Sequence, residues 1–245
     1  MSETANITKK ALLALSGGID STTVLAWLLD SGYSVHCCLF HYGSKHNKFE
    51  IEAAKNVYAY YEKEFPGRML GITEIDLRTV FANYRSNLLQ GQGEIPEGHY
   101  NDKTMSQTVV PARNIIFLSM MAGLAESNNI DKIAIGIHQG DHHIYPDCRP
   151  EFFYEQAKAI FAGTSNNVLP IAPFLLHNKA SIVRYGLTVG APYHLTRTCY
   201  KAQPVACGKC GSCVERLEAF KLCGVEDPIE YATTDYERGE YFECF

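Results

Sequence analysis

Apolar residues are grouped along this chain in two different ways. Apolar runs that are too short for helices predict strands at residues 11–15, 34–40, 69–75, 132–137 and 168–171. Between them, apolar residues three and four positions apart predict helices at residues 22–29, 45–65, 113–126, 151–161, 178–183 and 214–221. Strands alternating with helices are typical of an α/β fold with a mainly parallel sheet, doubly wound so that helices cover both faces.

The first predicted strand is followed at once by the glycine-rich turn Ser-Gly-Gly-Ile-Asp-Ser, which begins at Ser16. A turn between a strand and a helix directs backbone N–H groups and the positive end of the helix dipole at one point, which favours an anion. Gly17 and Gly18 let the backbone curl around a phosphate. Ser16 and Ser21 can add hydroxyl donors, and Asp20 is placed to cap the helix or to hold Mg²⁺. The alternative is a turn without a ligand.

Two cations, Arg113 and Lys179, fall at the starts of predicted helices. A positive charge is unfavourable there, because the helix dipole is also positive at this end, unless an anion shares the site. A triphosphate or a substrate carboxylate would be such an anion, so both side chains are candidates for neutralising one. For Arg113 the alternative is an exposed surface arginine.

Two further stretches are unusually polar. Residues 138–150 contain three histidines and two aspartates, but the spacing is poor for a metal site because no pair lies four residues apart on a predicted helix. We expect this stretch to recognise a substrate, with Asp147 and Arg149 as polar contacts. Residues 77–110 are rich in Asn, Gln and Gly, which is typical of a lid or of a contact for substrate or subunit; the alternative is a disordered surface excursion.

Four of the nine cysteines crowd into one short stretch: Cys199, Cys207, Cys210 and Cys213. Soft thiolates in Cys-x2-Cys spacing match tetrahedral Zn²⁺, and four ligands leave no open position, so the zinc would be structural. An iron–sulfur cluster is the rival metal site, and a redox dithiol is a weaker alternative. Cys223 and Cys244 lie outside the spacing and receive no role.

Composition limits the function classes that remain. The 245 residues, 46% apolar and 20% charged, suffice for one sizeable core with a small appendage. A net charge of −5 disfavours a broad nucleic-acid surface. Because the chain has no apolar run long enough to span a bilayer and residues 1–10 are polar, we expect a cytoplasmic protein without membrane attachment.

The sequence Ser-Gly-Gly-Ile-Asp-Ser after a strand resembles the pyrophosphate loop of the PP-loop ATP pyrophosphatases, which have an adenine nucleotide alpha hydrolase-like fold. Enzymes of that group hold the β- and γ-phosphates of ATP as a leaving group and transfer AMP to a substrate oxygen. The resemblance implies nucleotide contacts from the loop and from the end of the second strand. These are Leu15, Ser16, Gly17, Gly18, Ile19, Asp20, Ser21 and Phe40.

Further motifs make the resemblance specific, and between residues 12 and 220 the chain is similar to the 7-cyano-7-deazaguanine synthase (QueC) family. Besides the glycine-rich turn, the matching stretches are His41-Tyr-Gly-Ser-Lys-His46, Val110-Pro-Ala-Arg-Asn114, Tyr145-Pro-Asp-Cys-Arg149, Asn178-Lys-Ala180, and Thr198-Cys-Tyr200 with Cys207-Gly-x-Cys210. The resemblance implies a PP-loop domain over residues 8–190 and a zinc-binding C-terminal region packed on it over residues 191–245.

The family converts 7-carboxy-7-deazaguanine, ammonia and ATP into a nitrile, which is a C–N bond-forming ligase reaction. The catalytic residues that the resemblance implies, acting with ATP and Mg²⁺, are Ser16, Asp20, Ser21, Arg113 and Lys179. The implied contacts with the small-molecule substrate are Tyr42, Asp147, Cys148 and Arg149. A homodimer is also implied.

Residues 42–46 and 136–145 differ from the usual family sequence in loops that should face the substrate. The resemblance therefore leaves a second activity open, in which the enzyme stops at the amide or attaches the deazaguanine to a protein or another macromolecule. Residues 77–110 would then receive that partner. A PP-loop tRNA thiolase is disfavoured by the acidic balance and by cysteines committed to one metal site. A non-catalytic nucleotide sensor is disfavoured by the intact loop.

Overall fold

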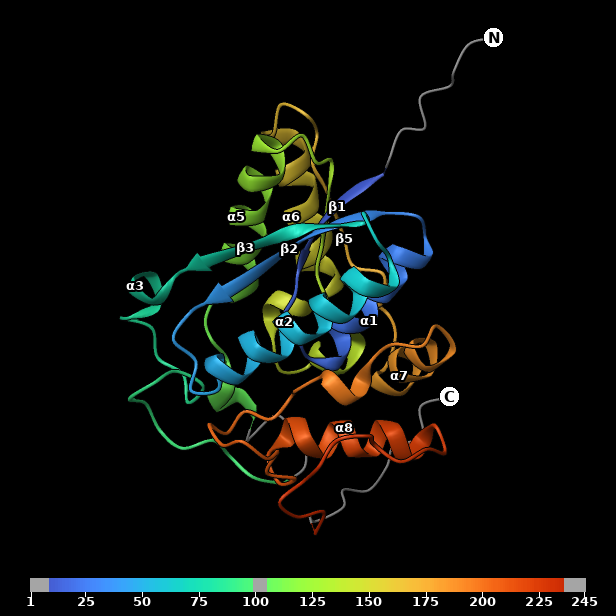
Figure 1. The fold of residues 1–245 in the computed structure, drawn as a ribbon. Helices are drawn as coiled ribbons and strands as arrows, with labels where there is room; N and C mark the ends of the chain where they lie inside the picture. The colour runs from blue at the N-terminus through green and yellow to red at the C-terminus, as the bar shows by residue number, and fades with distance from the viewer. Residues whose placement is uncertain (1–8, 99–104, 236–245) are drawn as a thin grey trace.

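The computed structural model describes residues 9–98 and 105–235 of the chain (Figure 1). Three expectations reach beyond these ranges. They concern the polar start of the chain, the middle of the segment at 77–110, and the end of the C-terminal region with Cys244. For residues 1–8, 99–104 and 236–245 these expectations lie outside the described residues.

The central sheet of the described chain has five parallel strands in the order β3-β2-β1-β4-β5 (Figure 1). The strands are β1 (Lys10–Ala14), β2 (Ser34–His41), β3 (Met69–Asp76), β4 (Lys132–Ala134) and β5 (Leu169–Ile171). The predicted strands and the fold class are confirmed. β4 is shorter than predicted and ends at Ala134. At Gly136 the chain runs against the glycine-rich turn, where an added Cβ would lie 3.0 Å from the Ser21 nitrogen.

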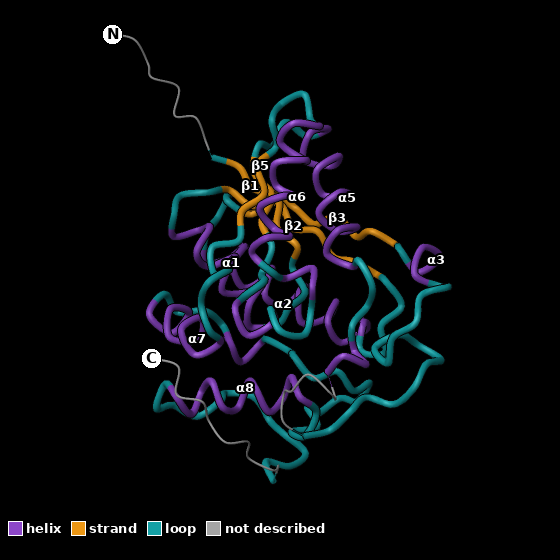
Figure 2. The backbone as a smooth tube through the Cα atoms, turned by 180° about the vertical axis from the view of Figure 1, so that it is seen from behind, coloured by secondary structure: helices purple, strands orange, loops and turns teal. Residues whose placement is uncertain are grey.

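Helices cover both faces of the sheet (Figures 1 and 2). They are α1 (Ile19–Asp30), α2 (Asn47–Glu64), α3 (Arg78–Phe81), α5 (Arg113–Ser127), α6 (Pro150–Gly163), α7 (Lys179–Thr188) and α8 (Gly211–Leu222). One face carries α5 and α6, whereas α1 and α2 lie on the other with α7 beside α1 and α8 beyond α7. Each helix predicted from the sequence is present, and the doubly wound arrangement is confirmed.

The central strands are buried on both faces, as continuous apolar runs predict. In β1, Leu12 packs in the layer of α5 and α6, whereas Leu13 packs in the layer of α1 and α2. In β2, Cys38 and Cys37 divide between the same two layers, so both are core residues. This alternation fixes the register, because a slip of one residue would exchange the two layers.

β1 lies at the centre of the sheet, and the strands that follow it are added on opposite sides. The chain passes from β1 to β2 and β3 in one direction, and later returns to β4 and β5 in the other. Ligands of open parallel sheets bind outside the carboxyl ends of the strands at such a switch point. The turn at Ser16 leaves β1 at this point and the chain at Gly136 leaves β4, so the topology places a candidate site between them.

The connection between β3 and α5 rests on the cysteine-rich region. The Gly98 N–H donates to the Lys209 carbonyl at 2.8 Å, and Glu97 forms an ion pair with Lys201. Ile95 packs against the cluster of buried cysteines. The described parts of this connection are therefore anchored on the C-terminal region, while the predicted role as a lid, substrate contact or subunit contact stays a prediction.

One stretch, Ser106–Ser127, is long and apolar enough to cross a membrane by length and composition, with a hydropathy of 1.4. It is interrupted, since a short 3₁₀ turn (Ser106–Thr108) is separated from α5 by Ala112 in the left-handed conformation. α5 buries Phe117 and Leu118 in the core layer between the sheet and the helices α5 and α6. We interpret α5 as a core helix of the α/β fold.

The N-terminus of α5 is closed by a carboxylate from another loop. Asp147 Oδ2 accepts from the Asn114 backbone N–H at 2.8 Å, and the Asp147 carbonyl accepts from the Asn114 side-chain amide at 3.0 Å. Ala112, at the cap position of α5, makes no side-chain cap. An acidic group suits this place because it compensates the positive end of the helix dipole.

Replacing this remote cap tests its contribution to stability. Asp147→Ala should lower the free energy of unfolding by about 1–2 kcal/mol in urea denaturation, because a backbone N–H of α5 loses its acceptor. Asp147→Asn keeps a hydrogen-bond acceptor and should lower the free energy of unfolding by less than Asp147→Ala. Glu155→Ala, on the exposed side of α6, is the control and should stay within about 0.5 kcal/mol of the parent. An unchanged Asp147→Ala protein would refute the capping role.

Candidate functional site

A cavity opens at the carboxyl edge of the sheet, between the loops that leave β1 and β4. Its empty volume is about 1150 Å³ with open solvent included. Most of the residues singled out in the sequence lie in its wall: Leu15, Ser16, Gly18, Asp20, Ser21, Phe40, Tyr42, Arg113, Cys148 and Lys179.

The two serines of the glycine-rich turn fix its shape. The Ser16 backbone N–H donates to Ser21 Oγ at 3.2 Å, the two hydroxyl oxygens are 3.0 Å apart, and the Gly18 N–H donates to Ser16 Oγ at 3.3 Å. Gly18 is the cap residue of α1 and makes no side-chain cap. The N-terminus of α1 therefore lies at the cavity wall without a capping side chain from Gly18, which is an arrangement that binds anions.

Gly17 holds the turn between two distant segments. Its φ of 75° is left-handed, and an added Cβ would lie 2.4 Å from the backbone nitrogen of Ala54 in α2. On the C-terminal side, the Gly17 carbonyl accepts from the Arg197 N–H at 2.8 Å. Only glycine fits this position. The conformation of the turn therefore depends on α2 and on the segment that leads into the cysteines.

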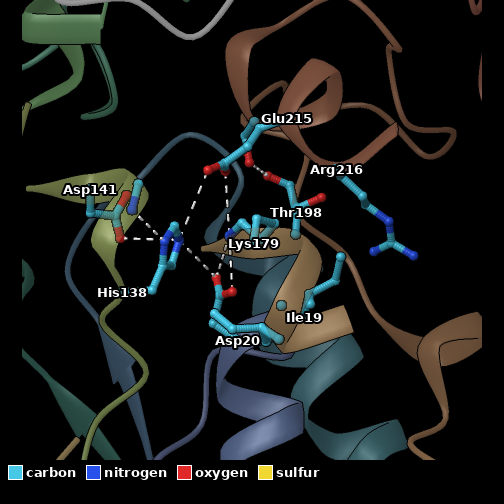
Figure 3. Close-up of polar contacts among 12 residues, drawn as sticks. Ile19, Asp20, His138, Asp141, Lys179, Thr198, Glu215 and Arg216 are labelled. Atoms are coloured by element: carbon cyan, nitrogen blue, oxygen red, sulfur yellow. Dashed lines mark hydrogen bonds and ion pairs between the residues drawn. The ribbon is translucent and has the colours of Figure 1, made fainter. Parts of the chain in front are cut away.

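A buried lysine joins the turn to two helices that lie far away in the sequence (Figure 3). Lys179 of α7 donates to both carboxylate oxygens of Asp20, at 2.9 and 2.7 Å, and lies 3.3 Å from Glu215 of α8. The His138 Nε2 atom lies 3.4 Å from Asp141, 3.9 Å from Asp20 and 4.0 Å from Glu215. One ammonium group, one imidazole and three carboxylates thus meet beside the turn.

Burial disfavours charge in this cluster, but opposite charges prevail at two of its members. The pKa of Asp20 is lowered despite burial, because Lys179 and His138 stabilise the carboxylate. The pKa of Lys179 is raised despite burial by Asp20 and Glu215. At Glu215 burial prevails over Lys179, and the pKa is raised. Asp20 and Lys179 are therefore a charged pair at neutral pH, with the Asp20 carboxylate bound by Lys179.

The end of β2 forms an apolar side of the cavity. The ring of Phe40 is stacked on Phe117 of α5, with the ring centroids 3.9 Å apart. The Phe40 carbonyl accepts from the Asn47 side-chain amide at 3.1 Å. A carbonyl oxygen has two lone pairs, so this bond leaves one of them for a ligand. The nucleotide contact that the resemblance implies at Phe40 stays a prediction.

Arg113 is partly buried in the cavity wall, which excludes the alternative of an exposed surface arginine. Its guanidinium lies 5.7 Å from the centroid of the Tyr42 ring. Burial opposes its charge, but Tyr42 and other neighbours raise its pKa. The pKa of Tyr42 is raised to about 12, chiefly by burial. Burial also raises the pKa of Cys148 well above its usual value, so this cavity residue is a neutral thiol.

Four predicted contacts lie outside the cavity wall that the described residues form: Gly17, Ile19, Asp147 and Arg149. Asp147 is occupied by the cap of α5. Arg149 is exposed and donates to the His142 carbonyl at 2.8 Å. Their contacts with the substrate stay predictions.

Other cavity residues carry chemistry that the sequence did not assign. His46, Glu50, Tyr200 and Glu215 all line the cavity. Glu50 follows His46 by four residues at a predicted helix start, a spacing that places both side chains on one face, so this signal was present. Glu215 stands in the helix after the last cysteine of the cluster, and nothing in its local sequence indicates that it reaches Lys179.

The four clustered cysteines are buried, and their sulfur atoms all lie within 4.8 Å of one another. Tetrahedral coordination with bonds of about 2.3 Å would place the sulfurs about 3.8 Å apart, and those of Cys207 and Cys213 are 3.9 Å apart. Backbone N–H groups also point at sulfur, with Lys209 and Cys210 donating to Cys207 at 3.4 and 3.3 Å. Such donors favour thiolates, so the cluster fits one metal ion.

Comparisons with known proteins agree with this geometry. A family model described as "Queuosine biosynthesis protein QueC" matches residues 10–224. A 7-cyano-7-deazaguanine synthase from Marinomonas sp. (strain MWYL1) is 42% identical over 227 residues, which cover 92% of this chain and 99% of that protein. A protein of the same name from Methanoregula boonei is 41% identical over 223 residues, covering 91% of this chain and 99% of the relative.

Among solved structures, the chain is similar to NMN synthetase from Francisella tularensis with a TM-score of 0.47 and 11% identity, covering 90% of this chain and 79% of that one. This likeness is too weak to carry an argument. The family match spans most of the chain, including the glycine-rich turn, the cavity and the cysteine cluster. The chain therefore belongs to the queuosine biosynthesis protein QueC family.

Proposed function

We propose that the chain is an ATP-dependent ligase that converts 7-carboxy-7-deazaguanine and ammonia into 7-cyano-7-deazaguanine. The relatives that bear the corresponding name cover nearly the whole chain. One structural observation carries the proposal: the anion-binding turn at Ser16 shares a cavity with the buried Lys179 ammonium group. A turn that holds phosphates next to a positive charge suits adenylyl transfer.

The first step activates the substrate carboxylate. The turn holds the β- and γ-phosphates of ATP through its N–H groups and the hydroxyls of Ser16 and Ser21, while Lys179 offsets negative charge on the leaving pyrophosphate. Arg113 binds the substrate carboxylate. A carboxylate oxygen attacks the α-phosphorus, the bond to the pyrophosphate breaks, and an acyl-adenylate forms. The protein contributes position and charge, and the enclosed site limits hydrolysis of the adenylate.

The following steps make the nitrile. Ammonia attacks the acyl carbon, AMP leaves, and loss of a proton gives the amide. The amide oxygen is then adenylylated by a second ATP, with release of pyrophosphate and a proton. Loss of AMP and of the second nitrogen-bound proton forms the triple bond. Cys148 serves as part of the wall in this scheme, because a neutral thiol is a poor nucleophile.

Metal ions complete the proposal. The carboxylates of Asp20 and Asp141 at the cavity are the hard oxygen donors that Mg²⁺ prefers, and Mg²⁺ bound with ATP would neutralise phosphate charge. The four cysteines would hold one structural Zn²⁺, which fits their soft sulfurs and leaves no coordination position for chemistry. Both assignments rest on donor chemistry.

The names of the relatives favour nitrile formation over the alternative that ends at the amide or at a conjugate. We also propose a cytoplasmic homodimer that acts on small molecules. The net charge of −5 supports the absence of a nucleic-acid substrate. The boundary between a PP-loop domain at 8–190 and a zinc-binding region at 191–245 remains part of the proposal.

Product analysis tests the reaction. Purified protein incubated with ATP, Mg²⁺, ammonium and 7-carboxy-7-deazaguanine should yield the nitrile together with AMP and pyrophosphate, detected by mass spectrometry. Accumulation of the amide alone, or of a protein adduct, would support the alternative activity. Absence of any conversion of the acid would refute both.

The glycine-rich turn can be tested by removing one hydroxyl. Ser16→Ala should lower the rate of AMP release by about 100-fold or more, because a donor to the transferred charge is lost. Ser119→Ala, at an exposed position on α5, is the matched control and should keep the parent rate. Both proteins should melt at nearly the parent temperature. Full activity of Ser16→Ala would show that the phosphates bind elsewhere.

Metal analysis tests the cysteine cluster. The purified protein should contain one zinc per chain, and Cys210→Ser should lose most of the metal and melt at a clearly lower temperature, because metal binding stabilises the folded state. Cys223→Ser serves as the control, since this cysteine lies outside the cluster and contacts the Ala180 carbonyl. A brown, iron-containing protein would identify an iron–sulfur cluster instead.

A further inference from the structure

One end of the cavity is polar and has no part in the scheme above. Its wall there contains Glu50 and His46 from the start of α2, Tyr42 from the end of β2, and Tyr200 from the C-terminal region. The His46 and Tyr200 rings lie 5.3 Å apart between centroids. This polar end is therefore bordered by aromatic rings as well as by a carboxylate.

Glu50 differs from the other carboxylates that line the cavity. Asp20 and Glu215 are bound by the Lys179 ammonium group, and Asp141 lies in the same cluster next to His138. Among the described residues, the partners of the Glu50 oxygens are His46 Nε2 at 3.3 Å and Ser44 Oγ at 3.2 Å, both at the long end of the hydrogen-bond range.

His46 gives an independent sign that a ligand binds here. Its side chain is 3% exposed, and its Nδ1 atom has no hydrogen-bond partner among the described residues. Buried polar atoms in folded proteins are almost always hydrogen-bonded, so an unpaired nitrogen in a cavity wall calls for a partner from the cavity. The carboxylate of Glu50 lies beside the other ring nitrogen, Nε2, and is ionised, since His46 and Arg113 lower its pKa despite burial.

Two ring systems could bind beside Glu50, the deazaguanine of the substrate and the adenine of ATP, and their hydrogen-bonding groups decide between them. The pyrimidine ring of a 7-deazaguanine presents two adjacent donors, the ring N–H and the exocyclic amine, and a carboxylate accepts from both. Adenine presents one amine next to an unprotonated ring nitrogen, which a carboxylate repels. A carboxylate at this place in the cavity thus selects the deazaguanine over the adenine of ATP.

We propose that Glu50 is a specificity-determining residue that binds the 2-amino-pyrimidinone edge of the substrate, with His46 supporting it. This inference rests on the proposed function. The Arg113 guanidinium lies 5.7 Å from the centroid of the Tyr42 ring and would meet the edge of the bound ring where the keto oxygen and the carboxylate are neighbours. The two charged side chains therefore orient the ring so that its carboxylate is presented for adenylylation.

The experiment compares 7-carboxy-7-deazaguanine with its analogue that lacks the 2-amino group. For the parent protein, kcat/KM measured by AMP release should fall by about 10- to 100-fold with the analogue, because one hydrogen bond to a charged group is lost. Glu50→Gln should raise KM for the natural acid by a similar factor, leave KM for ATP unchanged, and bring the preference between the two acids to within about 3-fold.

Two controls separate recognition from structure. Glu52→Gln, on the exposed side of the same helix, should behave as the parent protein. Glu50→Asp, which keeps the charge, should restore part of the preference. If Glu50→Gln lowered kcat/KM equally for both acids, or for neither, the proposal would be overturned, because Glu50 would then only hold Ser44 and His46 in place.

Calorimetric binding of the two acids distinguishes failure of this proposal from failure of the proposed function. Binding of the natural acid with a preference that depends on Glu50, but without AMP release, would sustain the specificity role and refute the reaction. A protein that binds neither acid would refute both. Turnover by a parent protein that does not discriminate between the acids would sustain the reaction and refute the specificity role.

Discussion

The ion pair between Lys179 and Asp20, with Glu215 beside it, is the contact on which the arrangement of this site depends. It joins the helix after the glycine-rich turn to α7 and to α8 of the cysteine-rich region, so three segments distant in sequence meet at one buried ammonium group. Removing one partner from such a group leaves an unpaired charge in a poorly solvated place, which costs several kcal/mol, about 3–5 in known cases. The same cluster gives the turn its positive neighbour.

Local sequence was sufficient to predict the strands and helices, the glycine-rich turn and the cysteine cluster. The strands and helices follow from apolar spacing, and the cysteine tetrad follows from its own spacing, because both signals depend on residues near each other in the chain. Asp147 shows the limit of this reasoning. Its polarity suggested a ligand contact, which stays a prediction. The structure adds that Asp147 caps α5, a pairing that becomes visible only once the fold is known.

Glu215 and Glu50 line the cavity but could not be assigned to it from the sequence, for two different reasons. Glu215 reaches Lys179 because α8 packs near α7, which is a matter of tertiary structure. Glu50 carried a local signal in its spacing from His46, but an acidic residue on a helix is usually solvated. Its role becomes visible only when the cavity shows which carboxylates are already paired with cations and which retain capacity to accept hydrogen bonds.

The cavity wall contains residues from both halves of the chain, so it is completed in steps while the protein is synthesised. The glycine-rich turn leaves the ribosome before Thr198, Tyr200 and Glu215, which line the same cavity. Until they do, the turn lacks the Arg197 contact to Gly17 and one carboxylate beside Lys179. The cavity wall is therefore complete only after α8 has been synthesised.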